Sequence, residues 1–331
     1  MPDLKRPAAL NRLAVLTSGG DSPGMNAALR AVVRAADAAQ MSCVGIADGY
    51  KGMIDGRLKP LDARDVSGIL QLGGTVLGTA RSTRFRTPEG REIAAKNLRN
   101  AGVDAVVVIG GDGSMQGAKL LSEEHGFAVV GIPGTIDNDL SGTDFTLGFD
   151  TAVNTAVDAM DKIRDTAASH NRLFFIEVMG RHAGWIALYS GLAGGATAVL
   201  VPESSWEEDS IRAKVLESFA LGKRFCIVVV AEGGEEGGAF GVARRVTHET
   251  DLDYRVSTLG HMQRGGAPTM RDRVLGARLG DAAVAALLDG EDQIMVGERR
   301  LEIVRTPFEE TWTTDDRDFA GLLGLMDRLA R

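Results

Sequence analysis

Short apolar runs alternate with longer segments of helical periodicity along the first half of the chain. The runs at residues 13–17, 105–109 and 128–132 have the length and the branched side chains of buried strands. Helical patterns follow the first two runs, at residues 26–39 and 114–124. This alternation predicts βαβ units, in which the strands are parallel and a helix makes each connection.

The second half of the chain repeats the alternation. Apolar runs at residues 173–178, 198–201 and 226–231 are separated by helical segments such as 206–220. Apart from Glu177, successive positions of these runs are apolar, as expected of strands that helices cover on both faces. The predicted fold class is therefore α/β, with two similar three-layer α/β/α lobes, mostly parallel sheets and an active site in the cleft between the lobes.

Three further segments bear on how the chain is organised. Residues 150–168 and 271–288 have the pattern of long helices, and the first is expected to lead from one lobe to the other. The glycine-rich segment 233–241 is expected to be a mobile surface loop. Since no linker marks a border, the chain is expected to cross between the lobes more than once.

Composition narrows the class of protein. The chain has 331 residues, which exceeds the length that a single hydrophobic core usually supports. This length favours two lobes. Its formal net charge of -8 argues against a partner such as nucleic acid, which requires a basic surface. The sequence shows no apolar run of about 18 residues and no cleavable leader, so we expect a cytoplasmic protein without a membrane partner. Cys43 and Cys226 fall in expected strands and are interpreted as inert core thiols.

Three glycine-rich turns stand at expected strand exits, at residues 18–21, 110–114 and 134–139. In open α/β sheets, ligands bind outside the carboxyl ends of the strands. Glycine lets the backbone approach an anion closely, and a helix start after the second turn offers unpaired N–H groups. Asp112 in that turn is a candidate ligand for a divalent cation. The three turns therefore indicate a site for phosphate and metal.

Two common nucleotide-binding motifs are absent from the sequence. Gly111 and Gly113 are not followed by the third glycine of the dinucleotide fingerprint. Gly222 and Lys223 lack the earlier glycine and the following hydroxyl residue of a Walker motif. A nucleotide must therefore be held by another scheme.

The third turn carries two carboxylates, Asp137 and Asp139, and one of them could act as a base. For an isolated Asp-x-Asp pair, turn formation or helix capping is the commoner role. Clusters of arginines change this balance, because guanidinium groups match phosphate oxygens. Their members are Arg81, Arg84, Arg86, Arg172, Arg181, Arg255 and Arg264, of which Arg181 and Arg264 lie next to glycines. Phosphoryl transfer to a hydroxyl needs a metal, cationic groups and a proton acceptor, which Asp112, the arginines and Asp137 could supply.

Five motifs, in this order, closely resemble those of the 6-phosphofructokinase family. They are LTSGGDSPGMN at 16–26, GGDGS at 110–114, PGTIDND at 133–139, MGR at 179–181 and LGHMQRGG at 259–266. The match runs from about residue 12 to about residue 310. The resemblance implies transfer of a phosphoryl group to the 1-hydroxyl of fructose 6-phosphate, a step of glycolysis.

The resemblance also implies roles for individual residues. Asp137 would accept the proton of the hydroxyl, Asp112 would hold Mg²⁺, and Arg81, Thr135 and Arg181 would complete the catalytic group. The nucleotide site would comprise Gly20, Arg81, Ser82, Gly111, Asp112, Gly113 and Ser114. The sugar-phosphate site would comprise Thr135, Ile136, Asp137, Arg172, Met179, Gly180, Arg181, Glu232, Arg255, His261, Met262, Gln263 and Arg264.

Lobes and assembly follow from the same resemblance. Residues 1–147 with about 263–312 would form the larger, nucleotide-binding lobe, and residues 148–262 with about 313–331 the smaller, sugar-phosphate-binding lobe. Positions that match Arg172 and Arg255 reach into the neighbouring subunit's site in this family. The resemblance therefore implies a homotetramer.

Members of the family use either ATP or pyrophosphate as the phosphoryl donor. Pyrophosphate users typically carry an aspartate and a lysine where this chain has Gly113 and Gly134, so these glycines favour ATP. A carboxylate at position 113 would also repel an α-phosphate. Ser82, however, stands where ATP users often have an aromatic residue, and residues 180–185 are similar to the branch that includes pyrophosphate users. The preferred hypothesis is an ATP-dependent enzyme, and the alternatives are a pyrophosphate-dependent enzyme and a catalytically silent sugar-phosphate sensor.

Overall fold

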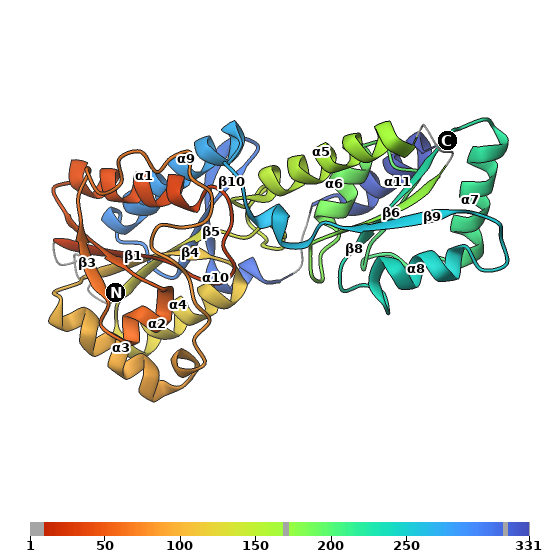
Figure 1. The fold of residues 1–331 in the computed structure, drawn as a ribbon. Coiled ribbons are helices and arrows are strands. Elements are labelled where there is room, and N and C mark those ends of the chain that lie inside the picture. The colour runs from red at the N-terminus through yellow and green to blue at the C-terminus, as the bar shows by residue number, and fades with distance from the viewer. Residues whose placement is uncertain (1–9, 168–171, 314–316, 331) are drawn as a thin grey trace. The chain divides into compact units, whose positions relative to one another are not determined.

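A computed structural model describes residues 10–167, 172–313 and 317–330, and it divides the chain into two compact units, each with a sheet of its own (Figure 1). Unit 1 comprises Met1–Thr135, Leu140–Gly148 and Arg264–Asp315. Unit 2 comprises Ile136–Asp139, Phe149–Gln263 and Asp316–Arg331. The chain passes between the units more than once, as the sequence predicts.

The sheet of unit 1 has seven strands in the order β11-β10-β5-β4-β1-β2-β3. Its strands are β1 (Arg12–Thr17), β2 (Ser42–Ile46), β3 (Leu58–Leu61), β4 (Ala105–Gly110), β5 (Ala128–Pro133), β10 (Ile294–Arg299) and β11 (Glu302–Pro307). The five central strands are parallel, and the edge strands β3 and β11 pair antiparallel to their neighbours. The runs expected as strands near residues 13, 105 and 128 lie side by side at the centre of this sheet.

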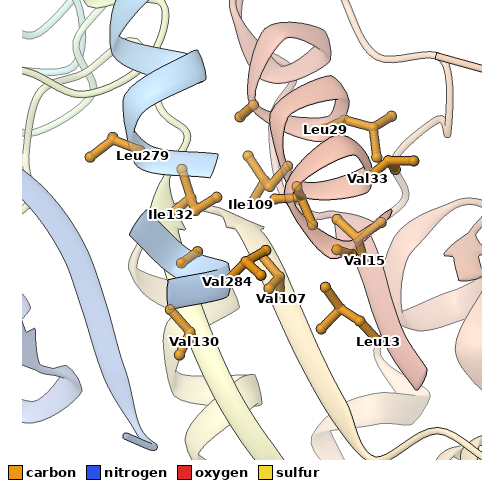
Figure 2. Close-up of a cluster of buried hydrophobic side chains, with 14 of the residues drawn as sticks. Leu13, Val15, Leu29, Val33, Val107, Ile109, Val130, Ile132, Leu279 and Val284 are labelled. Atoms are coloured by element: carbon orange, nitrogen blue, oxygen red, sulfur yellow. The ribbon is translucent and has the colours of Figure 1, made fainter. Parts of the chain in front are cut away.

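Helices cover both faces of the unit 1 sheet. They are α1 (Met25–Ala38), α2 (Gly49–Ile54), α3 (Pro88–Asn100), α4 (Asp112–His125), α9 (Met270–Leu288) and α10 (Phe308–Thr311). Successive strand residues point to opposite faces, so Leu13 and Val15 join the apolar cluster under α1 and α9, whereas Ala14 and Leu16 join the cluster under α2, α3 and α4. Figure 2 shows the first cluster, in which Leu29 of α1 and Val284 of α9 lie over the central strands. Each such buried side chain contributes about 1.5–3 kcal/mol relative to exposure.

The sheet of unit 2 has four parallel strands in the order β7-β8-β6-β9. They are β6 (Leu173–Val178), β7 (Ala198–Leu200), β8 (Cys226–Ala231) and β9 (Tyr254–Thr258). The helices of this unit are α5 (Phe149–Ala167), α6 (Trp185–Ala193), α7 (Glu208–Ala220), α8 (Gly238–Val246) and α11 (Phe319–Leu329). α7 and α8 pack on one face through a cluster that includes Phe175 and Val228, while α5 and α6 contact the sheet through β6 and β8. The fold class predicted from the sequence, α/β with mostly parallel sheets, is confirmed.

Three expectations about segments need correction. The segment 233–241, expected as a surface loop, ends in helix, because α8 begins at Gly238 and the Glu177 carboxylate accepts the N–H of Ala239 at 2.7 Å. The helix expected from residue 206 begins at Glu208, since the Trp206 indole donates to Glu235 at 2.6 Å.

The third correction concerns Ile136–Asp139, which the sequence assigns to the larger lobe but which groups with unit 2. The Arg317 guanidinium donates to the carbonyl oxygen of Asn138 at 2.6 Å and lies over the ring of Trp185, 4.5 Å from its centroid. These contacts tie the segment to residues of unit 2.

Both cysteines are buried and free, as expected of core thiols. Burial raises the pKa of the Cys43 thiol to about 12, and it also raises the pKa of Cys226. Among the residues that the structure describes, no helix is both long enough and apolar enough to cross a membrane.

Candidate functional site

The three glycine-rich turns of the sequence meet at one edge of the unit 1 sheet. β5, β4 and β1 are parallel neighbours, so their carboxyl ends lie together. The Ser18 N–H donates to the Ile109 carbonyl at 2.9 Å, and the Gly134 N–H donates to the Gly110 carbonyl at 2.9 Å. We call residues 18–21, 110–114 and 134–135 the glycine edge. The sequence expectation that these turns share one strand edge is confirmed.

Asp112 is exposed at the first residue of α4, directly after the N-cap Gly111. The first N–H groups of a helix lack intrahelical partners, and the helix dipole adds positive potential there, so an anion is favoured. At Gly113, a Cβ atom would meet no heavy atom within 4 Å. The start of α4 therefore offers open space, backbone donors and one carboxylate.

A single carboxylate fits Mg²⁺ in a phosphoryl-transfer site. The described residues contain no group of three or more histidine, cysteine, aspartate or glutamate side chains arranged to hold a metal. Mg²⁺ commonly takes one or two carboxylates and completes its shell with waters and substrate phosphates. The exposed Asp112 carboxylate suits that mode of binding.

Ser114 connects two of the turns through its side chain. It is buried, and its hydroxyl donates to the Ser18 hydroxyl oxygen at 2.9 Å. The Tyr50 hydroxyl donates to the Ser114 carbonyl at 2.5 Å. A Cβ atom at Gly110 would lie 2.6 Å from the Ser114 hydroxyl oxygen, so this glycine permits the close approach. The side chain of Ser114, a residue predicted to bind nucleotide, thus connects the first and second glycine-rich turns within the protein interior.

The segment before Arg81 lies against the first turn. The Thr17 hydroxyl donates to the Gly78 carbonyl at 2.8 Å, and the Thr79 hydroxyl donates to the Gly19 carbonyl at 2.7 Å. Arg81 itself is exposed, and the Ser82 hydroxyl oxygen accepts the Phe85 N–H at 3.2 Å. Thr79, which the sequence interpretation missed, holds this arginine-bearing segment at the glycine edge.

Arg264 lies over Gly20 in unit 1. Its guanidinium donates to the Asp21 carbonyl at 3.1 Å. A Cβ atom at Gly20 would lie 2.5 Å from Nη1 of Arg264, so a larger residue there would displace this guanidinium. The resemblance assigns Arg264 to the sugar-phosphate site, whereas in the structure it contacts the first glycine turn.

The third turn continues from unit 1 into unit 2. Thr135 is buried beside Gly111, where an added Cβ atom would lie 3.7 Å from the Cβ of Thr135, and its carbonyl accepts the Thr146 hydroxyl at 2.6 Å. The side chain of Ile136 is fully buried, and Asp137 is 4% exposed. Because Ile136 is apolar and enclosed, it offers a ligand only its backbone.

Strand exits also converge at the carboxyl edge of the unit 2 sheet. β8, β6 and β9 are parallel neighbours, and the Glu232 N–H donates to the Val178 carbonyl at 2.8 Å. The Leu259 N–H donates to the Glu177 carbonyl at 3.0 Å. Residues 179–181, 232 and 259–263 therefore lie at one edge, which we call the polar edge.

The 179–181 turn has an uncommon backbone. Gly180 and Arg181 adopt positive φ angles of 152° and 55°, and the Gly180 carbonyl accepts the Ala183 N–H at 2.9 Å. Positive φ is uncommon for a residue with a side chain, and such residues occur in turns and cluster at functional sites. A Cβ atom at Gly233 would lie 2.8 Å from the Arg181 carbonyl oxygen, so the loop after Glu232 closes on this turn. The Arg181 side chain is exposed.

The motif after β9 presents two side chains and buries a third. His261 and Met262 are exposed, whereas Gln263 is fully buried. The Gln263 carboxamide is bonded to backbone groups, accepting from Met179 and donating to Ala152. Sequence reasoning placed all three residues at the substrate without this distinction.

Arg172 and Arg255 lie at the other end of the same sheet. Arg172 immediately precedes β6, and Arg255 is the second residue of β9. Both pair with the Asp253 carboxylate, at 3.3 Å and 2.5 Å. A six-residue strand spans about 20 Å, so within one chain these arginines are remote from the polar edge. Asp253 was missed from the sequence, although its position two residues before Arg255 is a signal.

Comparison with known proteins decides the family. The family model described as Phosphofructokinase matches residues 12–287. The chain belongs to the phosphofructokinase family. Its glycine edge and polar edge hold the motifs on which the resemblance was based.

Other members of the phosphofructokinase family resemble the chain over nearly its whole length. ATP-dependent 6-phosphofructokinase 1 of Thermus thermophilus is 57% identical over 302 residues, which are 91% of this chain and 94% of the relative. ATP-dependent 6-phosphofructokinase of Bacillus subtilis is 54% identical over 89% of this chain and 92% of its own.

Solved structures of phosphofructokinases share the fold. The Saccharomyces cerevisiae enzyme aligns with a TM-score of 0.89 at 38% identity, over 97% of this chain and 48% of the yeast chain. This chain thus spans about half the length of the yeast one. A pyrophosphate-dependent phosphofructokinase from Marinobacter aquaeolei aligns with a TM-score of 0.79 at 23% identity, over 96% of this chain and 91% of its own, which shows a common fold alone.

Proposed function

We propose that the protein is an ATP-dependent 6-phosphofructokinase, which transfers the γ-phosphoryl group of ATP to the 1-hydroxyl of fructose 6-phosphate. The observation that carries this proposal is the near-full-length identity of up to 57% to enzymes of that name. The two strand edges support it, because one offers backbone donors and a metal ligand while the other offers charged side chains. The cytoplasmic location expected from the sequence stays a prediction.

The donor is proposed to bind at the glycine edge. Gly20, Gly111 and Gly113 give its phosphates access to the backbone, and Arg81 and Ser82 follow the segment beside the first turn. Asp112 would hold Mg²⁺, which neutralises charge on the phosphates when bound. Arg81 is exposed and long enough to add positive charge near the transferring group.

The acceptor is proposed to bind at the polar edge. Arg181 and His261 carry the cationic or donor groups that match a phosphate, and Glu232 accepts hydrogen bonds from sugar hydroxyls. Arg264, which contacts the first glycine turn, is proposed to add a further guanidinium to the sugar-phosphate contacts. Met179, Gly180 and Met262, with Thr135 and Ile136 of the third turn, complete the proposed contacts, and Gln263, whose carboxamide is buried, can offer only its backbone. Burial restricts Ile136 to its backbone, as described above.

Asp137 is the proposed base. The 1-hydroxyl must lose its proton as the phosphoryl group arrives, and a carboxylate within hydrogen-bond reach can accept that proton. Asp137 is almost fully enclosed, which suits a base that acts on a bound substrate away from bulk water. Arg181 and Arg81 would stabilise the charge that develops on the phosphoryl oxygens.

ATP is favoured over pyrophosphate by the surroundings of two glycines. A Cβ atom at Gly113 would meet nothing within 4 Å, which leaves room for the nucleotide beyond its terminal phosphates. A Cβ atom at Gly134 would lie 3.0 Å from Cε of Met25 and 3.1 Å from Cγ2 of Ile109, so a larger residue there would require repacking. Initial rates with ATP and with pyrophosphate at equal Mg²⁺ test the donor: faster turnover with pyrophosphate would refute this choice.

The role of Asp137 is tested by replacing it. Asp137→Ser is expected to lower kcat by several orders of magnitude with little change in fructose 6-phosphate affinity, because a base acts mainly on the transition state. Asp139→Asn is the matched control, since Asp139 belongs to the same turn but is exposed. Near-normal turnover of Asp137→Ser would remove the base from the mechanism, and binding of both substrates without turnover by the wild type would favour the silent sensor.

A homotetramer is proposed from the position of Arg172 and Arg255. Their distance from the polar edge of their own chain agrees with a role in a neighbouring subunit's site. Light scattering is expected to give four times the chain mass of 35.0 kDa. A monomer that is fully active would refute the proposal.

A further inference from the structure

Gln263 belongs to a motif with exposed side chains, yet its own side chain turns inward. It lies in the 3₁₀ helix η2 (Gly260–Arg264), directly after exposed His261 and Met262, yet its own exposure is 0%. Burying a carboxamide is costly unless both its oxygen and its nitrogen are hydrogen-bonded. The hydrogen bonds of such a side chain must therefore be made inside the protein.

Both ends of the Gln263 carboxamide bind backbone groups of unit 2. Its Oε1 accepts the Met179 N–H at 2.8 Å, and its Nε2 donates to the Ala152 carbonyl at 3.3 Å. Met179 is 6% exposed and Ala152 is fully buried. The side chain thus links the residue that follows β6 to the interior of helix α5.

The link reaches the turn that carries Arg181. Met179 is the first residue after β6, and the next two residues have the positive φ angles of 152° and 55°. A backbone in such a conformation persists only when its surroundings hold it. At the end of this turn, Gly233 lies so close that an added Cβ would be 2.8 Å from the carbonyl oxygen of Arg181. At its start, the Gln263 carboxamide accepts the N–H of Met179.

We propose that Gln263 is a positioning residue of the phosphoryl-transfer reaction: its carboxamide fixes the 179–181 turn and thereby the guanidinium of Arg181. This inference rests on the proposed function, which gives Arg181 the developing charge of the phosphoryl group. Gln263 acts through Arg181 and not by a side-chain contact with the sugar. A displacement of about 1 Å at a catalytic group can cost up to about a hundredfold in rate, so the positioning has a measurable effect.

The first test is Gln263→Met, which keeps the volume and removes both hydrogen bonds. We expect kcat to fall about tenfold to a hundredfold and KM for fructose 6-phosphate to rise a few fold, with KM for ATP unchanged. Asn97→Leu is the matched control: the Asn97 carboxamide donates to the carbonyls of Met53 and Ile54 at 3.0 Å and 2.8 Å, in unit 1, and Asn97 belongs to neither edge. It is expected to lower stability without this kinetic signature.

The decisive test is a double-mutant cycle with Arg181→Ala. If Gln263 acts through Arg181, then adding Gln263→Met to Arg181→Ala lowers kcat no further. Losses that multiply would overturn the proposal, because they would mean an independent contact with substrate. Unchanged kcat and KM in Gln263→Met would overturn it as well.

A second variant covers poor folding of Gln263→Met. Gln263→Asn keeps the carboxamide but is one methylene too short to reach both partners, so its kcat is expected to lie between those of the wild type and Gln263→Met, with the same non-additivity. A wild-type value in Gln263→Asn would contradict the positioning role. Failure of the proposed function is recognised separately, as absence of turnover of ATP and fructose 6-phosphate by the wild type.

Discussion

The glycine edge of unit 1 and the polar edge of unit 2 lie at equivalent places, the carboxyl ends of parallel strands, yet they are built from different chemistry. At the glycine edge, Gly20, Gly111 and Gly113 have no side chains to cover the backbone, and Asp112 supplies one carboxylate. At the polar edge, side chains such as Arg181, Glu232 and His261 project from the strand exits. A polyphosphate with its metal can be held by backbone N–H groups, whereas a sugar with several hydroxyls requires distinct side chains to be told from its isomers.

Among changes within the two edges, the largest expected effect comes from the carboxylate of the glycine edge. Asp112→Asn is expected to lower kcat/KM for ATP about a hundredfold or more and to raise the Mg²⁺ concentration required, because the proposed Mg²⁺ site would lose its ligand from the protein. Binding of fructose 6-phosphate, measured by calorimetry, should be unchanged if the two edges are separate in function. Glu123→Gln, near the other end of α4, is the control and should retain activity.

A charge added to the glycine edge tests donor choice. Gly113→Asp is expected to reduce kcat/KM for ATP about tenfold, which corresponds to about 1.4 kcal/mol, by repulsion of the donor phosphates. Stability should not change, since a Cβ atom at Gly113 meets no neighbour within 4 Å. The matched variant Gly134→Ala meets atoms at 3.0–3.2 Å and should lower the free energy of unfolding by about 1–3 kcal/mol. Equal kinetics of Gly113→Asp and the wild type would contradict a phosphate at this position.

Removal of one arginine from the opposite end of the unit 2 sheet affects only the acceptor. Arg255→Ala is expected to raise KM for fructose 6-phosphate several fold, with kcat and KM for ATP nearly unchanged, because it would remove one charge-assisted contact in the proposed tetramer. Lys214→Ala removes another surface cation of unit 2, paired with Asp327 at 2.8 Å, and should leave both KM values unchanged. Steady-state kinetics of the two variants, with their masses in solution, decide the matter.

The smallest effect concerns the support of α4, whose start carries Asp112. Arg91 of α3 is 5% exposed and pairs with Glu124 of α4 at 2.6 Å, and this pairing lowers the pKa of the Glu124 carboxyl. A lowered pKa means that the pair stabilises the fold at neutral pH and that this contribution is lost as the pH falls below about 4.3, the ordinary glutamate value. Glu124→Gln should therefore cost about 1–2 kcal/mol at pH 7 and less at pH 3 by denaturant titration. A cost independent of pH would contradict the pairing, and Asp158→Asn, at an exposed pair with Lys162, is the control.

The strand and helix patterns of the sequence predicted many elements of the fold correctly. The apolar runs of both sheets and the long helix near residues 150–168 are present, since a strand buried on both faces leaves a continuous apolar signature. The segment from residue 233 was misjudged because its glycines hide a helix start that a distant carboxylate, Glu177, stabilises. No local pattern contains that contact.

By itself, the sequence determined which chemical groups are present and in what order, because glycines at strand exits, a lone Asp112 and the arginine-bearing motifs can be recognised from neighbouring residues. Tertiary structure alone decided which of those side chains are exposed and which turn into the protein. Ser114 and Gln263 turn inward and bond to Ser18 and Met179. Residues within one motif share a sequence neighbourhood but not an environment, and the direction of each side chain is set by partners from other parts of the chain.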